Sequence, residues 1–203
     1  PADLVVLSFS DSDLGAFAAG WHLVKTELPT LRLANLVGLK HPLSVDTYID
    51  KTLSHARGIL IRLIGGKSYW DYGVQQVCAL AAEKNIALAI LPADGRVDAQ
   101  LDEMSTLPVS ILRRLCALCD TGGAEAARAA LGQLALAARL YVKPSFGPKR
   151  LPRVGGWTKE NGVICPAQVA CRIDARPLVV VCFYLSYLTA ADLNPFEVLS
   201  EKL

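Results

Sequence analysis

One short segment of the sequence has residue types that bind phosphate groups in many proteins. Gly65-Gly66-Lys67-Ser68 follows a run of apolar residues and has the ending of a P-loop. The complete pattern G-x-x-x-x-G-K-S/T needs another glycine five residues before Gly66, where this sequence has Ile61. The segment therefore predicts a tight turn from a strand into a helix, whose backbone N–H groups remain available to an anion.

A second polar segment, Ser8-Phe9-Ser10-Asp11-Ser12, follows the first apolar run and resembles a weak flavin-phosphate loop. Helix capping explains its hydroxyl groups equally well, since Ser and Asp are preferred at helix N-termini. The dinucleotide pattern G-x-G-x-x-G does not follow this run. Nucleotide binding is therefore not the favoured reading of either segment.

The cysteine and histidine residues do not form a recognisable catalytic or metal-binding pattern. Cys116 and Cys119 form a C-x-x-C motif, which suits a redox pair or half of a zinc site. A second C-x-x-C is missing and no histidine stands at ligand spacing, so we interpret both as buried thiols on one helix face. His41 precedes Pro42 and is interpreted as a turn residue with a possible polar contact. No catalytic residue, metal ligand or bound cofactor is predicted for this segment.

The sequence pattern predicts strands and helices that alternate along the first part of the chain. Short Val-, Ile- and Leu-rich runs predict four strands, at residues 4–7, 31–34, 59–63 and 86–91. Apolar spacing predicts helices between and after them. The first two are expected at residues 14–28, with Ser10 or Ser12 as the N-cap, and at residues 45–53, preceded by Ser44. A third follows a capping box at Ser68–Asp71. The last two are expected at residues 108–120 and 124–141, separated by a helix stop at Gly122-Gly123.

This alternation predicts an α/β fold with a doubly wound parallel sheet, Rossmann-like or flavodoxin-like, over residues 1–141. Ligands of such sheets bind beyond the carboxyl ends of the strands. The tentative ligand-binding residues at that edge are Ser10, Asp11, His41, Gly65, Gly66, Lys67, Trp70 and Asp94.

The remaining sequence is divided by a change in composition. Residues 142–177 are rich in Pro and Gly and belong to a basic stretch, which predicts a linker. Residues 178–203 begin with an apolar run at 178–183, expected to be a buried strand, and a helix is expected from Asn194. This last part is either an added strand of the first sheet or the start of a second, truncated α/β unit.

The overall composition limits the classes of protein that fit. The chain has 203 residues, a net charge of +2 and 52% hydrophobic residues, which excludes a disordered tail, a collagen-like fibre and a strongly cationic nucleic-acid binder. The longest uncharged stretch, residues 177–191, is shorter than the roughly 20 apolar residues that cross a bilayer. We therefore expect a cytoplasmic protein with neither nucleic acid nor membrane as its partner.

Several linked segments resemble the beginning of the aerobic cobaltochelatase large subunit, the CobN family, which is related to the magnesium chelatase large subunit. The most distinctive is Arg62-Leu-Ile-Gly-Gly-Lys-Ser-Tyr-Trp-Asp-Tyr-Gly. The segments Asp3–Gly15, Leu31–Leu36, His41–Asp46, Thr52–Gly58 and Leu91–Arg96 occur in the expected order.

The resemblance implies that this chain is the N-terminal part of a longer, tetrapyrrole-binding subunit. The complete enzyme is expected to insert Co²⁺ into hydrogenobyrinic acid a,c-diamide during cobalamin synthesis. It is expected to use ATP and Mg²⁺ through two AAA+ type partner subunits. This segment is expected to dock or scaffold rather than catalyse, together with the remainder of the large subunit.

Alternatives follow from the same residues. A corrinoid's carboxylates are candidate ligands of Lys67, Trp70 and the basic linker, and a stand-alone flavodoxin-like ligand-binding module also fits the fold. Leu185 and Tyr187 stand where the family usually has Arg and His, which fits a degenerate, truncated copy.

Overall fold

A four-stranded parallel sheet forms the centre of the computed structural model, which describes residues 1–24, 27–148, 151–152, 154–165 and 179–202. The strands are β1 (Leu4–Ser8), β2 (Leu31–Asn35), β3 (Gly58–Leu63) and β4 (Ala87–Pro92), in the order β2-β1-β3-β4. Each strand is short and rich in apolar residues, and β1, β3 and β4 are buried along their whole length, as strands covered on both faces must be. The four predicted strands are confirmed to within one residue at each end.

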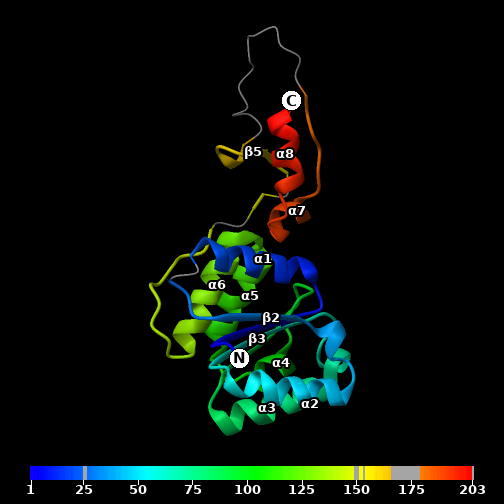
Figure 1. Cartoon of the computed structure of the whole chain (residues 1–203), viewed down its shortest axis with the longest axis vertical. Helices are drawn as coiled ribbons and strands as arrows, with labels where there is room; N and C mark the ends of the chain where they lie inside the picture. The colour runs from blue at the N-terminus through cyan, green and yellow to red at the C-terminus, as the bar shows by residue number, and fades with distance from the viewer. Residues whose placement is uncertain (25–26, 149–150, 153, 166–178, 203) are drawn as a thin grey trace.

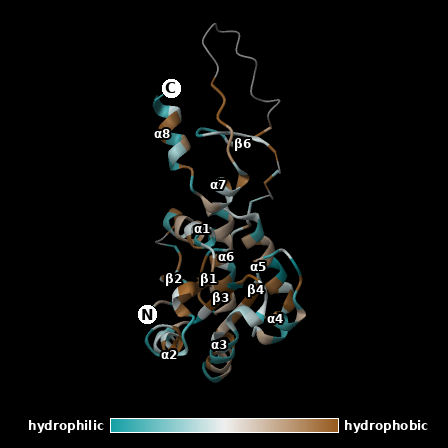
Figure 2. Ribbon diagram, turned by 90° about the vertical axis from the view of Figure 1, so that its right-hand side faces the viewer, coloured by the Kyte–Doolittle hydropathy of each residue, from teal (hydrophilic) through white to brown (hydrophobic). Residues whose placement is uncertain are grey.

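Helices cover both faces of this sheet (Figures 1 and 2). One layer consists of α1 (Asp11–Leu23), α5 (Val109–Thr121) and α6 (Gly123–Ala137), and the other of α2 (Pro42–Lys51), α3 (Asp71–Lys84) and α4 (Ala99–Met104). Alternate residues of β1 point into the two resulting cores: Leu4 and Val6 into the first, Val5 and Leu7 into the second. The predicted doubly wound fold is therefore confirmed.

Three short 3₁₀ turns connect these elements: η1 (Leu36–Leu39), η2 (Leu53–His55) and η3 (Lys67–Trp70). The last of them corrects the predicted capping box. Ser68 lies inside η3, and α3 begins at Asp71 without a side-chain cap. Asp71 instead accepts a hydrogen bond from Gln75, four residues later in α3, and pairs with Lys67 of η3, four residues earlier.

Other helix boundaries also differ from the prediction. The first helix stops at Leu23 rather than Leu28, and α6 stops at Ala137 rather than Tyr141 because Arg139 adopts a positive φ of 59°. Helix α2 begins at Pro42, earlier than Ser44 suggested, since His41 caps it. Helix α4 was not predicted; it is short and is capped by Asp98.

The C-terminal part forms a small separate layer above α1 and α6 (Figure 1). It contains an antiparallel hairpin of β5 (Gly156–Thr158) and β6 (Gly162–Ile164), followed by α7 (Leu185–Ala190) and α8 (Asn194–Lys202). The hairpin lies in the stretch expected to be a linker. The helix expected from Asn194 is confirmed.

The predicted buried strand at 178–183 is wrong for the residues that the structure describes, because residues 179–183 are neither buried nor part of the four-stranded sheet. Leu178 lies outside the described residues. An added fifth strand is thus excluded for these residues, because they lie beyond α7, away from the sheet edge (Figure 1). The start of a second α/β unit at this position stays a prediction.

Within the ranges that the structure describes, no helix is long and apolar enough to cross a membrane.

Candidate functional site

The carboxyl edge of the sheet contains the crevice in which open α/β folds bind ligands. The chain leaves β1 toward α1 on one face and leaves β3 toward α3 on the other, so the topological switch lies between these adjacent strands. Two cavities open near this edge, one around Arg62 and one around Gly66.

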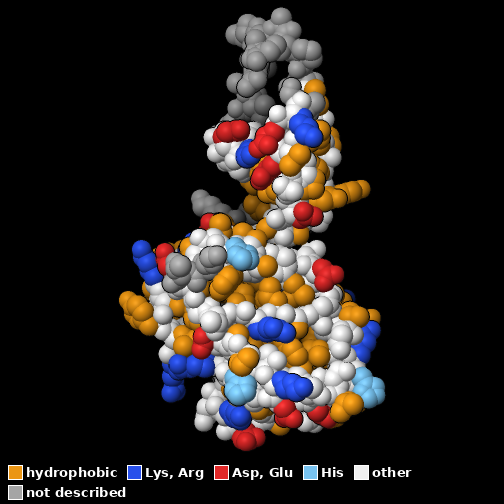
Figure 3. All heavy atoms as spheres, in the orientation of Figure 1, with side chains coloured by type: hydrophobic (Ala, Val, Ile, Leu, Met, Phe, Trp, Pro, Cys, Tyr) orange, Lys and Arg blue, Asp and Glu red, His pale blue; other side chains and the backbone are white. Residues whose placement is uncertain are grey.

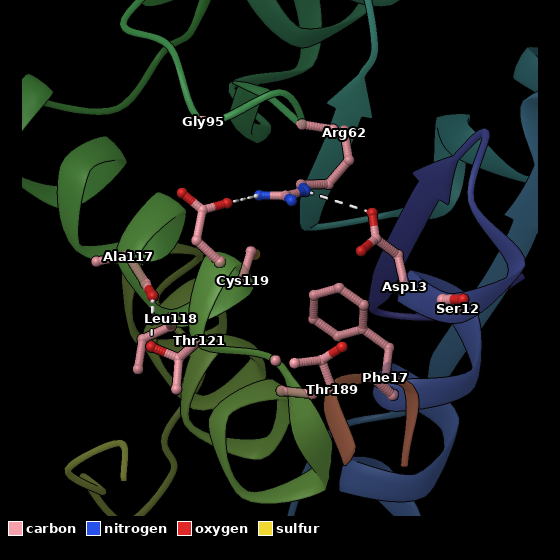
Figure 4. A pocket seen from close by; sticks show the side chains of 15 residues that line it. Ser12, Asp13, Phe17, Arg62, Gly95, Ala117, Leu118, Cys119, Thr121 and Thr189 are labelled. Carbon is pink, nitrogen blue, oxygen red and sulfur yellow. Dashed lines mark hydrogen bonds and ion pairs between the residues drawn. The ribbon is translucent and has the colours of Figure 1, made fainter. Parts of the chain in front are cut away.

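Arg62 dominates the first cavity (Figure 4). It is a charged residue in the otherwise apolar strand β3, and its side chain is only 5% exposed. Its Nε lies 3.4 Å from Asp13 Oδ2, and its Nη1 donates a hydrogen bond of 3.0 Å to Asp120 Oδ1. Burial by itself lowers the pKa of Arg62, but Cys119, Asp13 and Asp120 outweigh it and raise the pKa above its ordinary value. Arg62 is therefore a charged group at the centre of the switch point.

The two carboxylates extend this network to neighbouring elements. Asp13 Oδ2 also accepts a hydrogen bond of 2.9 Å from Ser8 Oγ at the end of β1. Asp120 lies near the end of α5, where its Oδ2 is 3.6 Å from the sulfur of Cys116. The network thus joins β1, α1, β3 and α5, and two carboxylates surround one guanidinium. Because the two carboxylates outnumber the guanidinium, the net charge of the network is negative and does not suit an anionic ligand.

The cavity beside this network has a volume of about 640 Å³ and is lined by residues from five elements (α1, β3, α5, α6 and α7) and by the loop after β4. Phe17 of α1 and Thr189 of α7 border it, and Cys119 of α5 lies opposite them (Figure 4). Burial raises the pKa of the Cys119 thiol to about 12, so this group is protonated near neutral pH. A protonated thiol is a poor nucleophile and a poor metal ligand.

Both cysteines of the C-x-x-C motif pack against the core from α5 but are only partly buried, so their interpretation as buried thiols is confirmed in part. Burial, together with the nearby charge of Asp120, also raises the pKa of Cys116. No group of three His, Cys, Asp or Glu side chains is arranged to hold a metal ion in the described part of the chain.

The second cavity, of about 510 Å³, contains three of the residues proposed from the sequence: Gly65, Gly66 and Lys67. Both glycines have positive φ angles, 79° and 76°, which explains why glycine stands there. The ammonium of Lys67 lies 3.3 Å from Asp71, and Asp98 borders the same cavity. Since two carboxylates and one lysine line this cavity, its charge does not match that of a phosphate site.

The other proposed residues make local contacts. Ser10 caps α1 by accepting from the Asp13 N–H, and Asp11 accepts a hydrogen bond of 2.7 Å from Asn35. His41 Nδ1 accepts from the Leu43 N–H at the start of α2, which places it in the turn role that the sequence indicated. Asp94 pairs with Arg96.

Trp70 lies in the core rather than at the surface of the crevice. Only 5% of the residue is exposed, and its Nε1–H is donated to the carbonyl oxygen of Leu39 at 2.7 Å. The structure thus groups Gly65, Gly66 and Lys67 in one cavity, while none of the eight proposed residues borders the Arg62 cavity.

Sequence reasoning missed Arg62, Asp13 and Asp120 as members of the most connected polar cluster. One signal was available, because a charged residue inside an apolar strand needs a buried partner. The partners themselves are 49 and 58 residues away along the chain, so the sequence pattern could not identify them.

Comparison with known proteins identifies relatives of this chain. No family profile matches the sequence. The chain is 34% identical to the aerobic cobaltochelatase subunit CobN of Sinorhizobium sp. over 100% of its own length and 16% of the relative's. It is 36% identical to the Pseudomonas aeruginosa CobN over 95% of its length and 15% of the relative's.

A solved structure has the same fold. The catalytic subunit of cobaltochelatase from Mycobacterium tuberculosis superposes with a TM-score of 0.72 at 20% identity, over 98% of this chain and 15% of that one. The chain spans about one sixth of the length of the curated relatives. The resemblance noted in the sequence is confirmed: the chain belongs to the CobN family, in which it matches an N-terminal segment of the large subunit.

Proposed function

We propose that this chain acts as a docking and scaffolding segment of a cobaltochelatase large subunit. The complete assembly inserts Co²⁺, its metal substrate, into hydrogenobyrinic acid a,c-diamide in cobalamin synthesis. The observation that carries the proposal is the similarity to two CobN subunits along 95–100% of this chain. Both relatives are named as cobaltochelatase subunits. This chain corresponds to only 15–16% of their length, so the chemistry of the whole subunit is not assigned to this chain by itself.

A scaffolding role, rather than a catalytic one, follows from how the polar groups at the sheet edge are used. Arg62 is bound by Asp13 and Asp120, Lys67 is paired with Asp71, and Trp70 is in the core. Catalytic groups need a reactive protonation state and access to the substrate. Neither the protonated thiol of Cys119 nor the paired charges meet this requirement.

The remaining parts of the proposal concern the partners. The rest of the large subunit holds the corrinoid and the metal. Two AAA+ type subunits hydrolyse ATP with Mg²⁺ to drive the insertion, so the complete enzyme is an ATP-dependent ligase. Its proposed location is the cytoplasm.

The test uses the Pseudomonas aeruginosa relative as a host. A chimera carries this chain in place of the matching segment of that CobN subunit, and a second protein lacks the segment entirely. Cobalt insertion is measured with the corrinoid, Co²⁺, ATP and the host's own partner subunits. We expect activity from the chimera and none from the deleted protein or from the 203-residue chain alone. Cobalt insertion by the isolated chain contradicts the scaffolding role, and a folded but inactive chimera contradicts the chelatase assignment.

A further inference from the structure

Residues 179–184 form an exposed apolar segment that leads into α7. Their sequence, Val-Val-Val-Cys-Phe-Tyr, consists of residue types that favour strands. Val180 is 72% exposed and Tyr184 is 82% exposed. In Figure 2 the segment rises from α7 as an extended hydrophobic trace, and Figure 3 shows hydrophobic side chains at the surface of the C-terminal part. Such a run is unusual on a surface that only water contacts.

One side of the segment is already packed. Phe183 stacks on Phe196 of α8 with ring centroids 4.2 Å apart, and Trp157 of β5 meets Phe183 edge to face. Val181 is less exposed than Val180, and Phe183 is less exposed than Tyr184. This alternation has the period of two that is typical of a strand with one covered face.

The backbone of the segment has the properties of an unpaired strand. No backbone hydrogen bond joins residues 179–183 to another part of the chain among the residues described here. Exposed strand edges are normally protected by lysine, proline or a bulge. Residues 178–191 contain no charged side chain and no proline, so this edge lacks such protection. An edge of this kind is suited to pairing with another strand.

We propose that residues 179–184 form a β-strand that pairs with a strand from the part of the CobN subunit outside the segment matched here. This inference rests on the proposed function. The CobN relatives match this chain over only 15–16% of their length, so most of the subunit is available to provide the partner. The paired segment then begins a second α/β unit, with α7 and α8 as its first helices.

The occupant is the rest of the large subunit rather than a second copy of this chain. In the relatives both parts belong to one polypeptide, which gives the partner strand a high effective concentration next to this edge. A second copy at micromolar concentration does not have this advantage.

Amide hydrogen exchange tests the pairing. Exchange is measured for residues 179–184 in the isolated chain and in the Pseudomonas aeruginosa chimera described above, with the amides of β1–β4 as an internal measure of folding. We expect fast exchange in the isolated chain and slowing by on the order of 100-fold or more in the chimera. Equally fast exchange in both proteins overturns the proposal.

Two lysine variants separate pairing from folding. Val180→Lys changes the proposed strand, and Val97→Lys is its matched control, since Val97 is 73% exposed and lies after β4. In the chimera we expect Val180→Lys to reduce the protection of residues 179–184 at least about tenfold, while Val97→Lys leaves it unchanged. Neither variant should alter protection of β1–β4. Equal effects of the two variants contradict the proposal.

Two further outcomes are decisive. A dimer of the isolated chain in sedimentation, abolished by Val180→Lys, identifies a second copy as the occupant and overturns the proposal. A chimera that inserts cobalt without protecting residues 179–184 overturns this inference and leaves the proposed function standing. Protection in a chimera that inserts no cobalt supports the pairing and contradicts the proposed function.

Discussion

The guanidinium of Arg62 donates a hydrogen bond of 3.0 Å to the carboxylate of Asp120, a residue 58 positions later in the chain. This contact fastens the carboxyl end of β3 to the end of α5, and the same arginine holds Asp13 near the start of α1. The topological switch point, which binds ligands in many related folds, is here bordered by an internal ion-pair network. The network therefore links β1, α1, β3 and α5 to one another at this edge of the sheet.

Replacing Arg62 should strongly destabilise the fold. Arg62→Met keeps most of the volume but leaves Asp13 and Asp120 facing each other without the guanidinium. Breaking one side of a buried ion pair costs about 3 kcal/mol. Urea unfolding of the full chain measures the change. Arg96→Met is the control, because Arg96 is 83% exposed and its pair with Asp94 should contribute about 0–1 kcal/mol. Similar stabilities for the two variants contradict this account.

Stability should also fall in alkaline solution because of Cys119. Burial raises the pKa of this thiol from 9.0 to about 12 in the folded protein. Between these values the unfolded chain loses the proton and the folded chain keeps it, so the unfolded state binds fewer protons and the free energy of unfolding decreases as pH rises. The contribution is complete below pH 9 and is lost toward pH 12.

The measurement is the free energy of unfolding against pH for three proteins. Cys119→Ala should have a shallower alkaline decline than the parent, by at most about 1.4 kcal/mol per pH unit. Cys182→Ala, which removes an exposed thiol outside the core that Cys119 packs against, is the control protein. An unchanged slope in Cys119→Ala shows that this thiol does not cause the decline.

Much of the first domain was predictable because its signals are local. The strands are runs rich in apolar residues. Helix α5 is separated from α6 at Gly122-Gly123, where positive φ angles of 71° and 79° require glycine. Helix α4 was missed since its six residues, Ala-Gln-Leu-Asp-Glu-Met, show little helical periodicity. Short elements depend on packing, here of Leu101 against the core.

The site was less predictable, since it depends on contacts between distant residues. Trp70 follows the end of β3 and was proposed as a ligand residue, but its indole N–H and ring are used in the core. Residues 179–184 have strand propensity, yet a strand needs a partner, and propensity does not show where that partner lies. The strands were thus readable from the sequence, whereas the neighbours of each polar or edge group were not.

Gly122 should be essential for the position of α7. A Cβ added there would lie 2.6 Å from Cβ of Thr189, and the residue has φ +71°. Gly122→Ala is therefore expected to displace α7 and to speed amide exchange in residues 185–190. Gly95→Ala is the control, because Gly95 has φ +75° with open space around it, so it should show only backbone strain of about 1–2 kcal/mol. Unchanged exchange in α7 of the Gly122→Ala protein contradicts this expectation.

The contact between Gly73 and Trp70 gives the last prediction. Alanine normally stabilises a helix by about 1 kcal/mol relative to glycine. At position 73 in α3, however, an added Cβ would lie 2.1 Å from Cε2 of the buried Trp70 ring. Gly73→Ala is therefore expected to destabilise the protein by about 1–3 kcal/mol through overpacking and to shift the tryptophan fluorescence.

A double-mutant cycle isolates this clash. In the Trp70→Leu background the obstructing ring is absent, so adding Gly73→Ala should cost about 1 kcal/mol less than it costs in the parent, or should even stabilise. Gly132→Ala in α6 is the control: the nearest atom to its added Cβ is Ser145 Oγ at 3.9 Å, so this change should stabilise by about 0.5–1 kcal/mol. Chemical unfolding of the four proteins in the cycle and of the control provides the values. Additive costs at positions 70 and 73 mean that the ring does not oppose the methyl group, and the short contact then has no energetic consequence.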